Sequence, residues 1–150
     1  MHVPDDPYSC WQLYKKRLKE EKHFSDASIE MIEDSSFEIM KRLSKKTDKH
    51  DPIRGLVIGN VQSGKTANMV GLMAMAADWG WNMFIVLSGT IENLRTQTQD
   101  RMIHDLNNNG NLMWQTIEHP EKKNSLNQQT KILIFNENAK VRCCCWPPYP

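Results

Sequence analysis

The sequence predicts an α/β fold built on a parallel β-sheet, and three observations support this prediction. Segments with the character of a strand, a helix, a strand and a helix follow one another between residues 53 and 106. The run NMFIVLSG at 82–89 is apolar throughout and lies between two glycines, which is typical of a buried parallel strand. A glycine-rich loop separates the first strand from the first helix. Strands that alternate with helices in this order form parallel sheets with helical crossovers.

Two amphipathic helices are predicted ahead of this core. In residues 10–22, Trp11, Tyr14 and Leu18 recur at helical spacing among lysines and glutamates. Residues 24–46 predict a second helix with Ser25 as its N-cap, acidic residues early and lysines late, which suits the helix dipole. The apolar stripe of this second helix is Ile29, Ile32, Ile39, Met40 and Leu43.

The predicted core begins with a strand at about 53–58. The helix after the glycine loop, KTANMVGLMAMAADWG, is apolar on nearly every face, which is typical of a buried helix, and Gly80 is expected to end it. Residues 90–108 predict a further helix, a short strand is expected around 112–116, and KILIF at 131–135 predicts another strand. One side of the 90–108 helix carries Ile91, Leu94, Thr98, Met102 and Leu106.

Three regions follow from this pattern. Residues 1–50 are expected to form an N-terminal helical segment, 51–136 a partial nucleotide-binding core and 137–150 an irregular tail. The tail contains the run VRCCCWPPYP, which has no periodicity, so we expect a truncated or frame-shifted reading frame there. Its adjacent cysteines lack the spacing of a zinc site.

Composition excludes several classes of protein. Lysine and arginine number 19 against 18 aspartates and glutamates, so a nucleic-acid contact has to be a local patch. The start of the chain has no signal peptide, and no apolar run approaches the roughly 18 residues that span a membrane. A cytoplasmic location with no membrane partner is therefore expected.

The glycine loop matches the pattern G-x-x-x-x-G-K-T. Glycines let successive backbone N–H groups turn inward toward phosphate oxygens, and the positive end of the following helix faces the same anion. Lys65 is expected to bind the β- and γ-phosphates, and Thr66 to supply a hydroxyl ligand for Mg²⁺. The predicted nucleotide-binding residues are Gly59, Asn60, Val61, Gln62, Ser63, Gly64, Lys65 and Thr66.

A second group of polar residues lies on the predicted helix after the second strand. Arg95 and Thr98 share one face of this helix, and Gln97 and Arg101 share another. From these residues alone, an ordinary solvated helix face is the favoured interpretation.

The chain resembles the Z-one domain of putative endonucleases, a helicase-like, superfamily-two-type ATPase family of bacterial restriction and phage-defence loci. The stretches that carry the resemblance are GNVQSGKT, GLMAMAADWGW and IVLSGTIENLRTQTQDR, with SSFEIMKRL ahead of them, and it covers about residues 25–106. The resemblance implies a RecA-like P-loop fold, ATP and magnesium as ligands and DNA as a partner. It also implies nucleic-acid contacts by Arg95, Gln97, Thr98 and Arg101.

The chain also departs from this family. The family needs an acidic pair after an apolar strand, where this chain has ILIFNENAK, and Asn136-Glu137 is either a degenerate version or part of an earlier strand. No catalytic residue, second ATPase lobe or nuclease motif is identified. The sequence therefore predicts the ATP-binding part of a helicase-like ATPase that handles DNA, completed by a C-terminal lobe or a partner protein. The alternative is a non-catalytic remnant that binds nucleotide or a protein without turnover.

Overall fold

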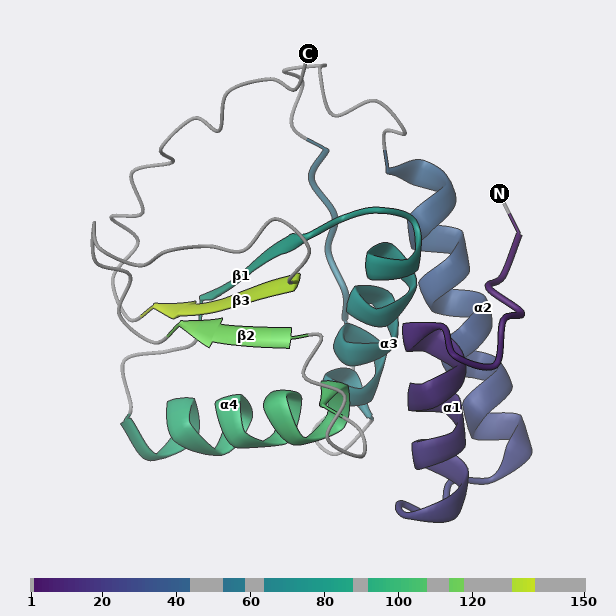
Figure 1. Cartoon of the computed structure of the whole chain (residues 1–150), viewed down its shortest axis with the longest axis horizontal. Coiled ribbons are helices and arrows are strands. Elements are labelled where there is room, and N and C mark those ends of the chain that lie inside the picture. Colours follow the sequence, from purple (N-terminus) through teal and green to yellow (C-terminus); the bar gives the residue numbers. More distant parts are fainter. Residues whose placement is uncertain are drawn as a thin grey trace.

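The structure is a computed structural model of the 150-residue chain. Figure 1 shows a layer of helices packed side by side next to a small sheet, with a further helix running along that sheet. The described residues are 2–43, 53–58, 64–87, 92–107, 114–117 and 131–136.

Both predicted N-terminal helices are present. Helix α1 spans Cys10–Glu20 and α2 spans Asp26–Arg42. Ser25 is the N-cap of α2, as predicted, and its side chain accepts a hydrogen bond from the Ser28 N–H. The three α1 residues predicted to face the core are almost completely buried. Helical periodicity and capping were therefore sufficient to place these two helices.

Helix α3 spans Lys65–Asp78 and is buried on most of its surface, as its composition predicts. It ends before Gly80, whose φ of 93° lies in the left-handed region that a side chain disfavours. The helix packs against α1, α2 and α4. Helix α3 is therefore the central element of the helical layer (Figure 1).

The sheet has three parallel strands in the order β1-β3-β2. Strand β1 spans Met83–Leu87, β2 spans Trp114–Ile117 and β3 spans Lys131–Asn136. Helix α4, Glu92–Leu106, connects β1 to β2, so a strand–helix–strand unit begins at β1. The arrows of β2 and β3 in Figure 1 point away from α3.

The prediction that the second strand is buried on both faces was wrong. In β1 the alternate residues Met83, Ile85 and Leu87 are exposed, while Val86 is buried and Phe84 is half-buried. Successive side chains of a strand point to opposite faces, so only one face of β1 is covered within the described residues. An unbroken apolar run is compatible both with a strand covered on two faces and with a strand covered on one.

The expected strand at 53–58 is also absent. This segment has no strand assignment, and all six of its residues are exposed, including Leu56 and Ile58 at 84% and 86%. Arg54 and Gly55 leave only three consecutive apolar residues, and glycine weakens a strand interior. A strand is stable only when it pairs with a neighbour, and the ladder is formed by β1, β2 and β3 instead.

One buried cluster joins all four helices with β1 and β2. Trp11, Met75 and Met102 are fully buried members from three of the helices. Phe84 of β1 and Trp114 of β2 meet with their ring centroids 5.3 Å apart. The residues of the predicted N-terminal segment thus share a core with the later elements.

In the part of the chain that the structure describes, no helix is long and apolar enough to cross a membrane.

Candidate functional site

The candidate site is the start of α3, where the predicted phosphate loop ends. Gly64 is the N-cap residue, with φ 74° and ψ 17°, a left-handed conformation that glycine adopts without steric cost. Its carbonyl accepts the first helical hydrogen bond, from the Asn68 N–H at 3.0 Å. The first N–H groups of a helix point outward along its axis and give that end a partial positive charge.

Lys65 and Thr66 are the first two residues of α3, and both are half-buried. They therefore lie in the turn at which an anion would meet the helix end. The other five predicted loop residues lie outside the described part of the chain. Those residues are Gly59, Asn60, Val61, Gln62 and Ser63.

The first turn of α3 makes contacts with both N-terminal helices. The Tyr14 hydroxyl of α1 donates a hydrogen bond to the Ala67 carbonyl oxygen at 3.2 Å. The Ser35 hydroxyl of α2 donates to Oδ1 of Asn68 at 2.6 Å. Neither contact is predictable from local sequence, because Tyr14 belongs to an apolar stripe and Ser35 is one of several polar residues on its helix.

The opposite end of α3 is attached to α1 by a carboxylate. Asp78 accepts hydrogen bonds from the N–H groups of Cys10 at 2.8 Å and Trp11 at 2.9 Å. These are the first two residues of α1, so a negative charge lies at the positive end of that helix. The last turn of a helix carries partial negative charge, so a carboxylate there is unfavourable unless it has a partner elsewhere. The position of Asp78 in the last turn of α3 is therefore a sequence signal for such a partner.

Between its ends, α3 lies very close to α1 and α2. A Cβ atom on Gly71 would lie 2.9 Å from Cγ2 of Ile32, 3.1 Å from Oγ of Ser36 and 3.2 Å from Cζ3 of Trp11. Only glycine therefore allows the three helices to approach this closely. The position of α3, and with it the position of the candidate site, is fixed by this packing.

The predicted nucleic-acid residues all lie on α4, at 95, 97, 98 and 101. Gln97 and Arg101 are exposed and four residues apart, so they share one solvent-facing side of the helix. Thr98 is half-buried, and the side chain of Arg95 lies outside the description. The structure thus brings two of the four predicted residues together on an open surface.

A buried charged cluster connects α1 to α4. Arg17 and Asp105 have exposed fractions of 5% and 2%, and Asp105 Oδ2 lies 2.5 Å from Nζ of Lys22. Arg17 also pairs with Glu21 at 2.9 Å and donates to the main-chain oxygen of His104. This cluster is not predictable from local sequence, since charged residues on helices are usually solvated and no local pattern distinguishes these as buried.

The charged cluster also affects Tyr14. Burial raises the pKa of Tyr14 well above its usual range, and the nearby negative charge of Asp105 raises it further. The phenol is therefore protonated at neutral pH and remains a hydrogen-bond donor to the Ala67 carbonyl.

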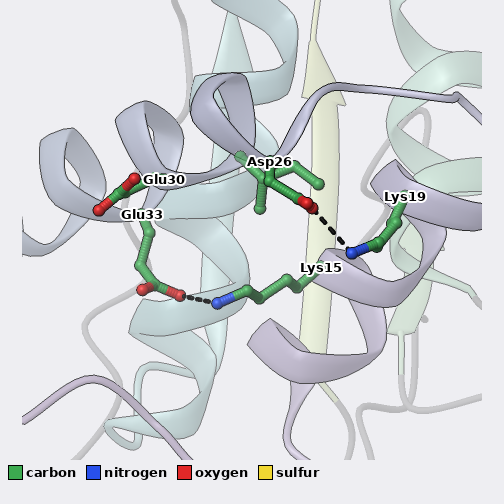
Figure 2. A pocket seen from close by; sticks show the side chains of 6 residues that line it. Lys15, Lys19, Asp26, Glu30 and Glu33 are labelled. Atoms are coloured by element: carbon green, nitrogen blue, oxygen red, sulfur yellow. Dashed lines mark hydrogen bonds and ion pairs between the residues drawn. The ribbon is translucent and has the colours of Figure 1, made fainter.

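A separate hollow of about 310 Å³ lies between α1 and α2. Figure 2 shows two pairs of its charged side chains pointing toward each other: Lys15 pairs with Glu33 at 2.7 Å, and Lys19 pairs with Asp26 at 2.8 Å. Because both lysines already have carboxylate partners, the hollow has no cation left to attract an anionic ligand. We place no ligand there.

Metal ligands are sparse in the described residues, which contain no group of three or more His, Cys, Asp or Glu side chains suited to a metal ion. Asn136 is the last residue of β3 and is in register with Leu87 of β1. Glu137, the acidic half of the degenerate pair, lies outside the described residues.

Comparisons with known proteins give this site no relative: no family model, curated protein or solved structure matches the chain.

Proposed function

We propose that this chain is the ATP-binding part of a helicase-like ATPase that acts on DNA, with residues 59–66 holding the triphosphate. The observation that carries the proposal is the start of α3. A left-handed Gly64 caps the helix, and Lys65 and Thr66 form its first turn. These three residues occupy the last three fixed positions of the G-x-x-x-x-G-K-T pattern.

The chemistry of this turn suits a polyphosphate. The positive end of α3 attracts the anion, and the Lys65 ammonium adds a full charge at the same place. The Thr66 hydroxyl fits the ligand preference of Mg²⁺, which binds oxygen donors. Bound Mg²⁺-ATP would supply the reactive phosphoryl group, with the metal neutralising its charge.

The scaffold behind the turn suits the same role. Ala67 and Val70 are buried, and Gly71 permits direct contact with α1 and α2. A binding site built on a packed helix keeps its geometry better than one on an isolated loop. The helix end therefore does not need to be ordered by the nucleotide.

The DNA part of the proposal rests on α4 and on the family resemblance. Gln97 and Arg101 form an exposed polar pair suited to contacting phosphates, and Arg95 precedes Arg101 by six residues on the same helix. In the intact protein, ATP hydrolysis would be coupled to DNA handling in the cytoplasm.

A second candidate function is nucleotide binding without turnover. The amide of Asn136 at the end of β3 favours it, because an aspartate there would complete the magnesium shell. Both candidates share the same phosphate-binding turn and differ only in hydrolysis.

The test of nucleotide binding is calorimetry with Mg²⁺-ATP on the full chain. Lys65→Ala should weaken binding, since it removes the charge that meets the phosphates. Lys16→Ala is the matched control, because Lys16 is an exposed lysine of α1 whose carboxylate partner Glu20 lies 3.9 Å away. Equal affinities for the wild-type protein and Lys65→Ala would refute the proposal.

The test of DNA binding is the salt dependence of affinity. If Arg95 and Arg101 each neutralise one phosphate, the double alanine variant should lose about two units of the slope of log K against log salt. Lys16→Ala again serves as control. An unchanged slope would assign α4 to an ordinary solvated surface.

A further inference from the structure

The first turn of α3 is held from two directions by the N-terminal helices. From α1, the Tyr14 hydroxyl reaches the Ala67 carbonyl, and from α2, the Ser35 hydroxyl reaches the Asn68 side chain. Ala67 and Asn68 directly follow Lys65 and Thr66 in the chain. Two helices that precede the phosphate loop in sequence therefore contact the turn that would bind the phosphates.

The Tyr14 contact is polar and fully enclosed. Tyr14 has an exposed fraction of 1%, and its hydroxyl lies 3.2 Å from the Ala67 oxygen in a buried setting. A buried hydroxyl needs a partner, and losing one leaves an unsatisfied group. Tyr14 therefore fixes the distance between α1 and the first turn of α3, which a phenylalanine of the same shape would not do.

The Ser35 contact acts on the residue that closes the turn. Asn68 donates its N–H to the Gly64 carbonyl, which is the first hydrogen bond of α3. Ser35 holds the side chain of the same residue at 2.6 Å. The neighbouring Ser36 faces a different part of α3, because its Oγ lies 3.1 Å from the position that a Cβ on Gly71 would take. Two adjacent serines thus contact the first turn and the middle of the same helix.

From these contacts we infer that α1 and α2 position the phosphate-binding turn, with Tyr14 and Ser35 as its two positioning residues. The inference rests on the proposed function, since the ligand is the same magnesium nucleotide. Its physical basis is preorganisation: a turn that is already held in place loses less freedom when the phosphates bind. Neither residue needs to touch the nucleotide.

The test uses calorimetry with Mg²⁺-ATP on full-length Tyr14→Phe and Ser35→Ala, at a temperature well below the unfolding midpoint. Each variant should bind about fivefold more weakly, the factor expected from one hydrogen bond. The matched controls are Tyr8→Phe, at an exposed tyrosine, and Ser36→Ala, at a buried serine next to Ser35. Both controls should bind like the wild-type protein.

Amide hydrogen exchange provides a readout without nucleotide. In Tyr14→Phe and Ser35→Ala, the amides of residues 68–70, which are the first hydrogen-bonded amides of α3, should exchange faster relative to those of 73–77, which lie near the other end of the helix. A general loss of stability would instead speed exchange along the whole helix. Ser36→Ala should leave the ratio between the two ends unchanged.

The outcomes separate this inference from the proposed function. If Lys65→Ala binds weakly while Tyr14→Phe and Ser35→Ala bind like the wild type, the inference is overturned and the proposed function stands. An equal loss in Ser36→Ala also overturns it, because the effect would then be general. If the wild-type protein binds no better than Lys65→Ala, the proposed function fails and the inference fails with it.

Discussion

Gly71→Ala is the substitution whose effect the packing predicts most sharply. In a free helix, alanine is more stable than glycine by about 1 kcal/mol. In α3, the new Cβ would lie 2.9 Å from Cγ2 of Ile32, 3.1 Å from Oγ of Ser36 and 3.2 Å from Cζ3 of Trp11. Real Cβ contacts of 3.4–4 Å are ordinary, so all three neighbours would have to move.

These neighbours cannot move independently. Cγ2 of Ile32 is attached directly to a β-branched carbon, whose rotamer is restricted in a helix, and Trp11 is a rigid ring with no exposed surface. Relief therefore requires α1 and α2 to move away from α3. Overpacking of this kind costs about 1–3 kcal/mol, which outweighs the gain in helix propensity. The expected net loss is about 1 kcal/mol.

Urea unfolding followed by circular dichroism measures this loss. Gly71→Ala should lower the midpoint without changing the slope, because the surface exposed on unfolding stays the same. Gly55→Ala is the control, since a Cβ on that exposed glycine has nothing within 4 Å. A Gly71→Ala protein as stable as the wild type would show that the three helices do not pack as described.

Two further predictions concern the charged cluster and the reaction. Asp105→Asn should lower the free energy of unfolding by about 2–3 kcal/mol, because it removes the buried carboxylate that pairs with Lys22 and lies 3.9 Å from the buried guanidinium of Arg17. Urea unfolding beside the exposed control Asp100→Asn measures this, and equal losses in both variants would contradict it. The 150-residue chain should bind ATP but release phosphate at a near-background rate. Phosphoryl transfer depends on charged groups that position the reactants, and no catalytic residue of this kind is identified in the chain. Phosphate release over many turnovers, with and without DNA, checks this, and sustained release that disappears in Lys65→Ala would contradict it and give Glu137 a role.

The helices could be predicted because their signals are local. Ser25, the spacing of Trp11, Tyr14 and Leu18, and the uniformly apolar α3 segment each report a cap or a buried face directly from the sequence. The start of α3 directly after Gly64 was likewise predicted from a local pattern, the G-x-x-x-x-G-K-T match.

The sheet could be predicted only in part, because strand pairing depends on distant residues. The segments of β1, β2 and β3 were recognised, but their order places β3 between the other two, and no local pattern specifies that. The apolar residues at 56–58 matched a strand pattern equally well, yet they have no place in the described ladder. A local apolar pattern can indicate that a segment is suited to a strand, but it does not specify the strand with which the segment pairs.

The contacts around the candidate site depend on tertiary structure in the same way. Tyr14 and Ser35 reach α3 across 53 and 33 residues of sequence, and Asp78 reaches α1 across 68. Only Asp78 had a local signal, as an acidic residue at the unfavourable end of a helix. The proposed phosphate-binding turn was recognised from the sequence, whereas the residues that contact it from α1 and α2 were not.

The most direct test of the account is to locate the bound nucleotide on the labelled protein. Amide chemical shifts of the full chain, recorded by NMR during titration with Mg²⁺-ATP, report which backbone groups the ligand meets. If Gly64, Lys65 and Thr66 bind the phosphates, the largest shifts fall on these three residues and are lost in Lys65→Ala. Shifts centred instead on Lys15 and Lys19, in the hollow between α1 and α2, or no shifts at all, would contradict it.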